Sequence, residues 1–227
     1  MSGTQQRRWN IYPSRDALVE RAALIIARIA DAAIAQHGEF NIVLAGGETP
    51  RAIYARLAEL DAKWSHWQAF FGDERVAPAD HADRNSTMAL DAWLSRCSEV
   101  RVHPIVTELG AERAATDYAR VIDAVRLDLV LLGLGEDAHT ASLFDMNAHD
   151  INDDVIKVDN APKPPRERVS LTPRCLSRGE NVLFLVTGAA KREAVARWRA
   201  GEMLPAALIR PVNGVDILID SGAYGVG

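Results

Sequence analysis

The sequence predicts an α/β protein with a doubly wound, mostly parallel sheet and helices on both faces. Short apolar runs such as Phe40–Ala45 and Leu127–Leu132 are typical of strands that are buried on both faces of a parallel sheet. Longer segments with apolar residues at helical spacing alternate with these runs, which indicates successive βαβ units. The 227 residues suit one domain. We therefore expect a single domain over 1–227, with a smaller accessory strand or flap region at about 145–170.

The individual elements follow from this alternation. Ser14 is expected to cap a first helix that ends near Gly38, and the strand at 40–45 leads to a helix from Pro50 to Leu60. Three prolines make the region after residue 145 irregular, so we expect a strand pair or a flap there. The other expected elements are strands at 67–71, 100–103, 127–132, 182–186 and 215–219, a loop at 72–84, and helices at about 86–94, between 103 and 127, and at 189–199.

Composition excludes several classes of protein. Twenty-six Lys and Arg residues against 31 Asp and Glu residues give a net charge of −5, which argues against nonspecific nucleic-acid binding. Two cysteines form neither a disulfide framework nor a four-cysteine zinc site and indicate a reducing compartment. The first ten residues lack the apolar core of a secretory signal, and the most apolar stretch, Ala22–Ala35, is too short to span a bilayer. We expect a cytoplasmic protein that binds neither nucleic acid nor membrane.

Ligands of parallel sheets bind beyond the carboxyl ends of the strands, so the loops there are candidate sites. Gly46 and Gly47 follow a strand and precede a helix, where backbone N–H groups are free to bind an anion, and Thr49 adds a hydroxyl. A simple tight turn is the alternative, and the nucleotide-binding P-loop pattern is absent. Lys191 lies in the first turn of a later helix, where its charge opposes the helix dipole unless a ligand anion offsets it.

Three charged residues follow the strand at 67–71. Arg75 can bind a phosphate through two N–H groups, and Asp73 and Glu74 accompany it, although a surface ion-pair cluster would have the same pattern. A metal site formed by Asp73, Glu74, His81 and Asp83 has little support from spacing alone, and we predict no metal.

The segment after the strand at 127–132 contains the strongest catalytic candidate. A Gly-x-Gly-x-x-Ala pattern begins at Gly133 and fits the dinucleotide fingerprint, but Glu136 and Asp137 within it would repel a pyrophosphate. His139 follows on the same loop, where an imidazole acts as a general base near neutral pH. Glu136 or Asp137 is placed to orient its second nitrogen.

Nucleophilic alternatives are weak. Ser142 lies outside a Gly-x-Ser-x-Gly elbow. Neither Cys97 nor Cys175 has neighbours that would lower the pKa of a thiol, so we expect both to be inert.

Five segments together resemble the 6-phosphogluconolactonase family, and the resemblance covers residues 12–220. His-Thr-Ala-Ser-Leu-Phe at 139–144 is its most specific part, whereas Ala138 stands where the family usually has Gly. The segments are Gly-Gly-x-Thr-Pro at 46–50, Phe-Gly-Asp-Glu-Arg at 71–75, the stretch from Asp128 to Phe144, Arg-Val-Ser-Leu-Thr at 168–172 and Val-Thr-Gly-x-x-Lys at 186–191.

The resemblance implies hydrolysis of 6-phospho-D-glucono-1,5-lactone to 6-phosphogluconate, the second step of the pentose phosphate pathway, without a metal or organic cofactor. We expect His139 to be the base, Asp137 to orient it, and the protein to act as a monomer or small homo-oligomer. The expected substrate-binding residues are Gly46, Gly47, Thr49, Asp73, Arg75, Arg168 and Lys191.

Two other functions fit parts of the pattern. Glucosamine-6-phosphate deaminases share the Gly-Gly-x-Thr-Pro and histidine loops, but their histidine is typically followed by Ile-Ala-Phe-Asn-Glu-Pro, whereas Thr-Ala-Ser-Leu-Phe follows here. A sugar-phosphate sensor of a transcription regulator would carry a DNA-binding module, and the sequence has no spare helix-turn-helix segment or basic patch. The lactonase is the favoured hypothesis.

Overall fold

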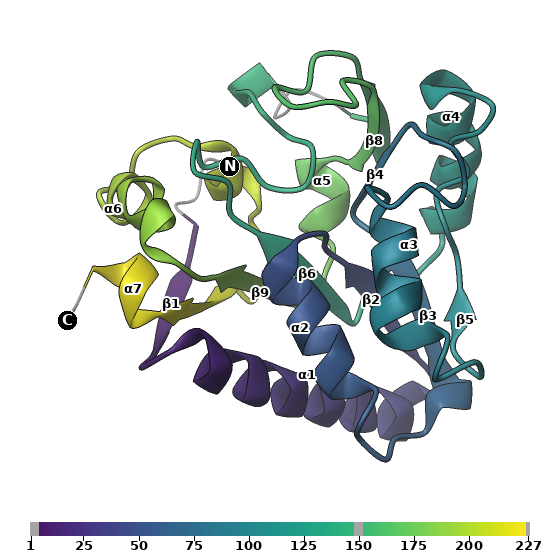
Figure 1. Ribbon diagram of the computed structural model, residues 1–227, viewed down its shortest axis with the longest axis horizontal. Helices are drawn as coiled ribbons and strands as arrows, with labels where there is room; N and C mark the ends of the chain where they lie inside the picture. The colour runs from purple at the N-terminus through teal and green to yellow at the C-terminus, as the bar shows by residue number, and fades with distance from the viewer. Residues whose placement is uncertain (1–4, 148–151, 226–227) are drawn as a thin grey trace.

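A computed structural model describes residues 5–147 and 152–225, and within them seven strands form one fully parallel sheet. Its strand order is β1-β10-β9-β6-β2-β3-β5, and every neighbouring pair is parallel. In the same described residues, β4, β8 and β7 form a small antiparallel sheet. Figure 1 shows α1 along the bottom of the molecule and the small sheet at the top. The predicted α/β class with a parallel sheet and an accessory strand region is confirmed.

The element bounds are as follows. The strands are β1 (Arg7–Tyr12), β2 (Phe40–Leu44), β3 (Trp67–Phe71), β4 (Asp73–Arg75), β5 (Arg101–Val102), β6 (Leu129–Gly133), β7 (Val155–Val158), β8 (Arg168–Leu171), β9 (Asn181–Val186) and β10 (Val215–Asp220). The α-helices are α1 (Arg15–His37), α2 (Glu48–Leu57), α3 (Asn85–Ala89), α4 (Ala111–Ile122), α5 (Pro173–Leu176), α6 (Arg192–Arg199) and α7 (Ser221–Tyr224). Short 3₁₀ turns are η1 (Trp64–His66), η4 (Ala189–Lys191) and η5 (Pro205–Leu208), and η2 (Leu90–Leu94) is a π-helical turn.

The first helix and the strand after it form for local reasons. The Ser14 hydroxyl accepts a hydrogen bond from the Ala17 amide at 3.2 Å and so caps α1. Gly38 ends the helix with φ of 92°, a left-handed conformation that glycine adopts without strain. All five residues of β2 are buried, as expected for a central strand of a parallel sheet.

Two strands were not predicted. β1 is an edge strand that pairs with β10 in the described part of the chain. Several of its residues are exposed, so its sequence lacks the apolar run that predicts a buried strand. β4 lies in the segment 72–84, which was predicted as a loop because its three charged residues have low strand propensity. The strand forms through its pairing with β8. The pairing of β7 with β8 confirms a strand pair in the region 145–170, of which residues 148–151 lie outside the described residues.

Several predicted helix ends were wrong by a few residues. α2 begins at Glu48 rather than at Pro50 and ends at Leu57 rather than at Leu60. The helix predicted at 189–199 begins with the 3₁₀ turn η4, and the one predicted at 86–94 continues as the π-helical turn η2. The chain also continues past β10 into α7.

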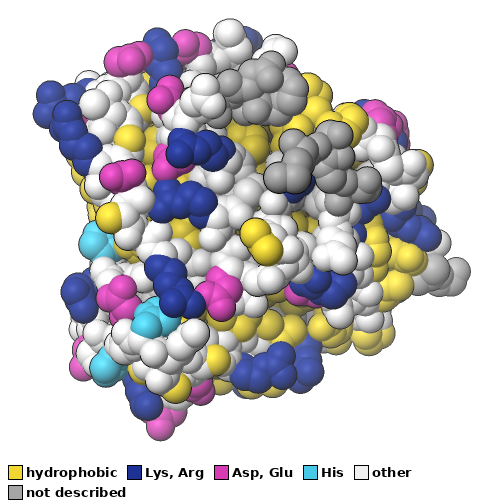
Figure 2. All heavy atoms as spheres, turned by 180° about the vertical axis from the view of Figure 1, so that it is seen from behind, with side chains coloured by type: hydrophobic (Ala, Val, Ile, Leu, Met, Phe, Trp, Pro, Cys, Tyr) yellow, Lys and Arg dark blue, Asp and Glu magenta, His cyan; other side chains and the backbone are white. Residues whose placement is uncertain are grey.

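The interior is apolar and the surface is mixed in charge. Trp67 and Trp93 are fully buried, with ring centroids 5.7 Å apart, and Phe40 packs edge-on against Trp67 at 4.6 Å. Figure 2 shows Lys and Arg side chains spread among Asp and Glu on one face. Among the described residues, no helix has the length and apolarity needed to cross a membrane.

Candidate active site

A cavity of about 580 Å³ lies at the carboxyl edge of the large sheet. β4 starts two residues after β3 ends, so the small sheet stands beyond this edge and forms one wall of the cavity. The loops after β2 and β6, the β7–β8 loop and the turn before α6 supply the other walls. Eight of the nine predicted site residues line this cavity: Gly46, Gly47, Asp73, Arg75, Asp137, His139, Arg168 and Lys191.

His139 and Asp137 form a hydrogen-bonded pair on the loop after β6. Nδ1 of His139 lies 2.5 Å from Oδ1 of Asp137, and the same oxygen accepts the His139 backbone N–H at 3.2 Å. Burial raises the pKa of the Asp137 carboxyl, but the hydrogen bonds from His139 outweigh it and hold the pKa below its ordinary value. The charged carboxylate therefore fixes a proton on Nδ1 and leaves Nε2 to accept one. The Phe144 ring, 4.7 Å away, packs against the imidazole.

The loop that carries this pair has an unusual backbone. Ala138 is fully buried with φ of 69°, a left-handed conformation that favours glycine, and this explains the glycine expected there from the resemblance. The Gly135 amide donates to the His139 carbonyl at 2.8 Å and closes the loop. A Cβ at Gly135 would lie 2.0 Å from Nδ1 of His139 and 2.4 Å from Oδ1 of Asp137. Only glycine allows the pair this close approach.

Two arginines stand side by side on the small sheet. Arg75 of β4 is the register partner of Arg168 of β8, so both side chains lie on the same face of the sheet. Arg75 donates to the carbonyl of Asp83, whereas its buried Nε has no partner among the described residues. Burial and the charge of Arg75 lower the pKa of the Arg168 guanidinium from its ordinary value. Like charges directly opposite each other are unfavourable, and a bound anion would remove this cost.

Asp73 and Asn85 tie the arginine wall to the histidine loop. The Asp73 carboxylate accepts hydrogen bonds from Nδ2 of Asn85 at 3.1 Å and from Oγ of Ser142 at 2.7 Å. The buried Glu74 carboxylate holds Asn85 in place by accepting its backbone N–H at 2.7 Å. A Cβ at Gly46 would lie 2.0 Å from Oδ1 of Asn85, so the first glycine loop and α3 are in close contact.

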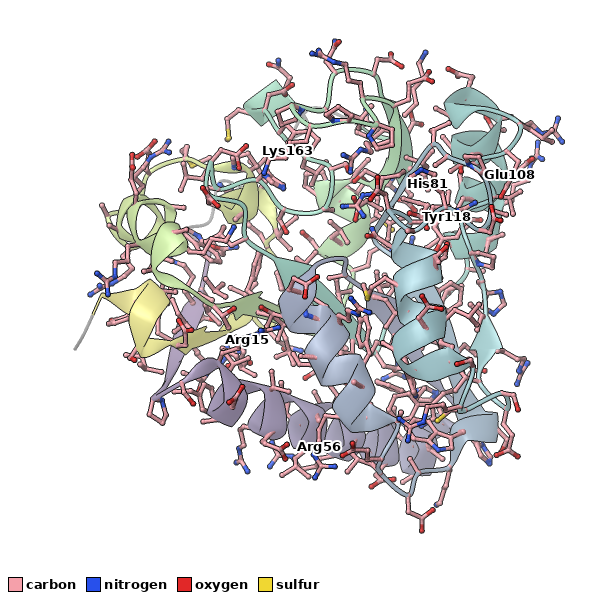
Figure 3. The ribbon with its side chains drawn as sticks, viewed as in Figure 1. Arg15, Arg56, His81, Glu108, Tyr118 and Lys163 are labelled. Carbon is pink, nitrogen blue, oxygen red and sulfur yellow. The ribbon has the colours of Figure 1, made fainter. Side chains whose placement is uncertain are left out.

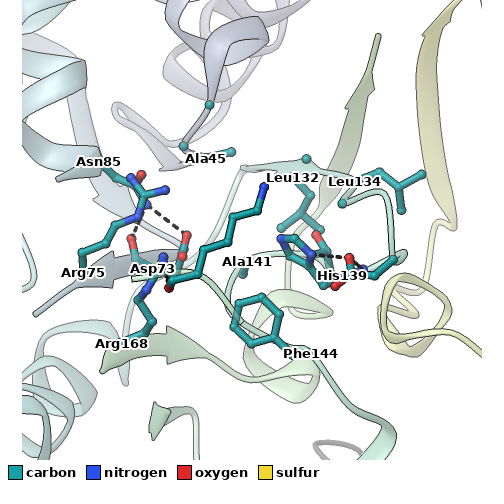
Figure 4. A pocket seen from close by; sticks show the side chains of 18 of the residues that line it. Ala45, Asp73, Arg75, Asn85, Leu132, Leu134, His139, Ala141, Phe144 and Arg168 are labelled. Carbon is teal, nitrogen blue, oxygen red and sulfur yellow. Dashed lines mark hydrogen bonds and ion pairs between the residues drawn. The ribbon is translucent and has the colours of Figure 1, made fainter. Parts of the chain in front are cut away.

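The side chains lie on two sides of the cavity (Figure 4). Arg75, Arg168, Asp73 and Asn85 occupy one side, and His139 lies on the other. Sequence reasoning did not assign Asn85 or Lys163 to the site, although both line the cavity. The position of Asn85 after a charged loop could have indicated that it belongs to the site. The proline-rich segment around Lys163 gave no such indication.

Thr49 differs from the other predicted site residues. Its hydroxyl lies 2.6 Å from the hydroxyl of Thr187, at the end of β9, and the side chain is not part of the cavity wall. Thr49 therefore links the first glycine loop to the loop that leads to Lys191. Its assignment as a substrate-binding residue stays a prediction.

The described residues give no support to the metal or thiol chemistry considered from the sequence. Among the described residues, no group of three or more His, Cys, Asp or Glu side chains is placed to hold a metal ion. Burial raises the pKa of the Cys97 thiol, and it raises that of Cys175 to about 12, as expected for inert cysteines.

Replacement of Asp137 tests the orientation of the imidazole. We expect Asp137→Asn to lower kcat by up to about 10²-fold, because the amide can donate to Nδ1 and move the proton to Nε2. The pKa of the Asp137 carboxyl is depressed, so its contribution to stability is present above the ordinary pKa and is lost as the pH falls through the lower folded value. The difference in unfolding free energy between wild type and variant should therefore shrink only at acid pH. Steady-state kinetics and denaturant unfolding across pH measure both effects, and an unchanged kcat would contradict the orienting role.

Comparisons with known proteins agree with this geometry. Residues 13–218 match the family model described as glucosamine-6-phosphate isomerases/6-phosphogluconolactonase. The chain is 35% identical to a 6-phosphogluconolactonase of Synechocystis, with 92% of this chain and 94% of that protein covered. It is 33% identical to a probable 6-phosphogluconolactonase of Drosophila melanogaster, with 92% and 91% covered.

A solved structure agrees as well. The crystal structure of a 6-phosphogluconolactonase from Thermotoga maritima superposes with a TM-score of 0.88 at 29% identity, and the match covers 95% of this chain and all of that one. The family match at residues 13–218 includes every residue that lines the cavity. The chain therefore belongs to the glucosamine-6-phosphate isomerase/6-phosphogluconolactonase family.

Proposed function

We propose that the protein hydrolyses 6-phospho-D-glucono-1,5-lactone to 6-phospho-D-gluconate. One observation carries the proposal: a His–Asp pair and a pair of arginines line the same cavity. A general base and a phosphate site that act on one substrate need this arrangement. The names of the curated relatives support the same reaction. The His-Thr-Ala-Ser-Leu-Phe segment at 139–144 favours the lactonase over the deaminase of the same family.

The proposed mechanism needs one base and one anion site. Arg75, Arg168 and Lys191 attract the phosphate, and the lactone carbonyl is thereby held near His139. Nε2 of His139 removes a proton from water while the resulting hydroxide bonds to C1. The bond between C1 and the ring oxygen then breaks, and the ring oxygen takes the proton from the imidazolium. A δ-lactone is an activated ester, so we propose that no metal, organic cofactor or covalent nucleophile takes part.

The cellular setting is part of the same proposal. We place the reaction at the second step of the pentose phosphate pathway, in the cytoplasm, and in a monomer or small homo-oligomer. The reaction itself is tested by coupled formation of 6-phosphogluconate from freshly made 6-phosphogluconolactone, with the spontaneous hydrolysis subtracted. Glucosamine 6-phosphate serves as the second substrate, and release of ammonia without lactone hydrolysis would contradict the proposal.

Arg75 is expected to act mainly in binding. We expect Arg75→Met to raise KM about tenfold or more with a smaller change in kcat, because a charge-assisted hydrogen bond to phosphate contributes about 1.5–3 kcal/mol. Arg101→Met is the control, because Arg101 lies on the edge strand β5 and is not part of the cavity wall. Initial rates over a range of substrate concentrations distinguish the two constants. A loss confined to kcat would contradict a role in phosphate binding.

A further inference from the structure

The loop between β7 and β8 forms part of the cavity wall without a role in the mechanism above. Pro162, Lys163 and Pro164 line the cavity, and Figure 3 shows Lys163 at the top of the molecule. Within the described residues, the Lys163 ammonium has neither a hydrogen-bond nor an ion-pair partner. Lys157, on β7, has two: Glu112 at 3.3 Å and Asp159 at 3.5 Å. An unpaired cation that lines a cavity is available to an anionic ligand.

Arg168 holds this loop against the small sheet. Its Nε donates to the carbonyl of Pro165 at 2.7 Å, and one terminal nitrogen donates to the carbonyl of Lys163 at 3.0 Å. The residue is only 6% exposed, so the guanidinium is fixed between strand and loop. The Ala161 amide donates to the Arg166 carbonyl at 3.0 Å and closes the base of the loop. Arg168 thus determines where the backbone of Lys163 lies.

The same contacts place the backbone of Lys163 next to the two arginines. The carbonyl of Lys163 touches the guanidinium of Arg168, and Arg168 is the register partner of Arg75. Two of the five N–H groups of Arg168 donate to the loop and fix the orientation of its guanidinium, whereas the three N–H donors of Lys163 sit on a flexible stem. An ammonium and a guanidinium are the usual ligands of a phosphate group.

We propose that Lys163 binds the phosphate group of the substrate together with Arg75, and that Arg168 is a positioning residue that holds the Lys163 loop. This inference rests on the proposed function, because it names the phosphate end of the same site. It changes the predicted role of Arg168 from direct substrate contact to support of its neighbour.

The first test replaces Lys163 by Ala. We expect KM for 6-phosphogluconolactone to rise about tenfold or more and kcat to stay near the wild-type value. Hydrolysis of unphosphorylated D-glucono-1,5-lactone should be unchanged, because that substrate lacks the phosphate. Lys157→Ala is the matched control on the same strand pair, and its KM should equal that of wild type. An unchanged KM in Lys163→Ala would overturn the proposal, and so would an equal loss on both lactones.

The second test separates positioning from contact. Arg168→Lys keeps the positive charge but loses the planar fork whose two nitrogens contact the two loop carbonyls, so we expect its KM to rise about as much as that of Lys163→Ala. The double variant should then be no worse than either single variant, whereas two independent phosphate ligands would give multiplied effects. Thermal unfolding of each variant checks that the fold is intact, and Lys163→Ala, an exposed substitution, tests the proposal if Arg168→Lys does not fold.

Binding of 6-phosphogluconate by calorimetry makes the two proposals separable. If wild type binds 6-phosphogluconate but does not hydrolyse the lactone, the proposed function fails while Lys163 is still tested by the Kd. We expect a Kd about tenfold or more weaker in Lys163→Ala. If wild type hydrolyses the lactone and Lys163→Ala binds 6-phosphogluconate as tightly as wild type, only the inference about Lys163 fails.

Discussion

Replacement of His139 by Ala should lower kcat by about 10²- to 10⁴-fold, the contribution of one positioned general base. KM should change little, because Arg75, which we propose to bind the phosphate, lies on the opposite side of the cavity. His139→Gln should lose a similar factor, since an amide forms hydrogen bonds but does not accept a proton from water. Steady-state rates with the spontaneous hydrolysis subtracted measure the effect.

A matched control comes from a histidine outside the cavity. Nδ1 of His66 lies 2.7 Å from the carbonyl of Gly38, and the residue precedes β3 at the amino end of the sheet. His66→Ala should keep the wild-type kcat. If His139→Ala retained the wild-type kcat as well, the base would have to be another group and the proposed mechanism would be wrong.

The parts of the fold that the sequence predicted are those with strong local patterns. β2, β6 and β9 are nearly uniform apolar runs because both faces of a parallel sheet are covered, and α1 carries its own cap at Ser14. β4 has no such pattern. Its three charged residues pair with β8, which lies about ninety residues further along the chain, and no local propensity indicates such a partner.

The same distinction applies to the site. His139 and Arg75 were predicted because each follows a buried strand at the edge where parallel sheets bind ligands. Lys163 was not, because its place in the cavity depends on two hydrogen bonds from Arg168. The hydroxyl of Thr49 contacts Thr187 across the chain, and nothing near Thr49 in the sequence indicates that contact. Local motifs were therefore enough to predict the function, whereas the contacts of each side chain could be known only from the folded structure.

A methyl group at Gly135 should impair activity almost as much as removal of the imidazole. The Cβ of Gly135→Ala would lie 2.0 Å from Nδ1 of His139, a distance that no carbon atom occupies next to a nitrogen that it is not bonded to. The ring or the Asp137 carboxylate must therefore move, and the 2.5 Å hydrogen bond between them is lost. Because a displacement of about 1 Å in an active site costs about 10²-fold, we expect kcat to fall by at least that factor.

Two further variants show whether the clash with His139 causes this loss. Gly222→Ala adds the same methyl group outside the cavity wall, where a Cβ would be no closer than 3.4 Å to its neighbours, and should keep the wild-type kcat. In the double variant with His139→Ala the ring is absent, so the added methyl should lower kcat no further than His139→Ala alone. A kcat for Gly135→Ala close to that of wild type would mean that the His139–Asp137 pair tolerates displacement, and a multiplied loss in the double variant would place the effect of Gly135 elsewhere in the loop.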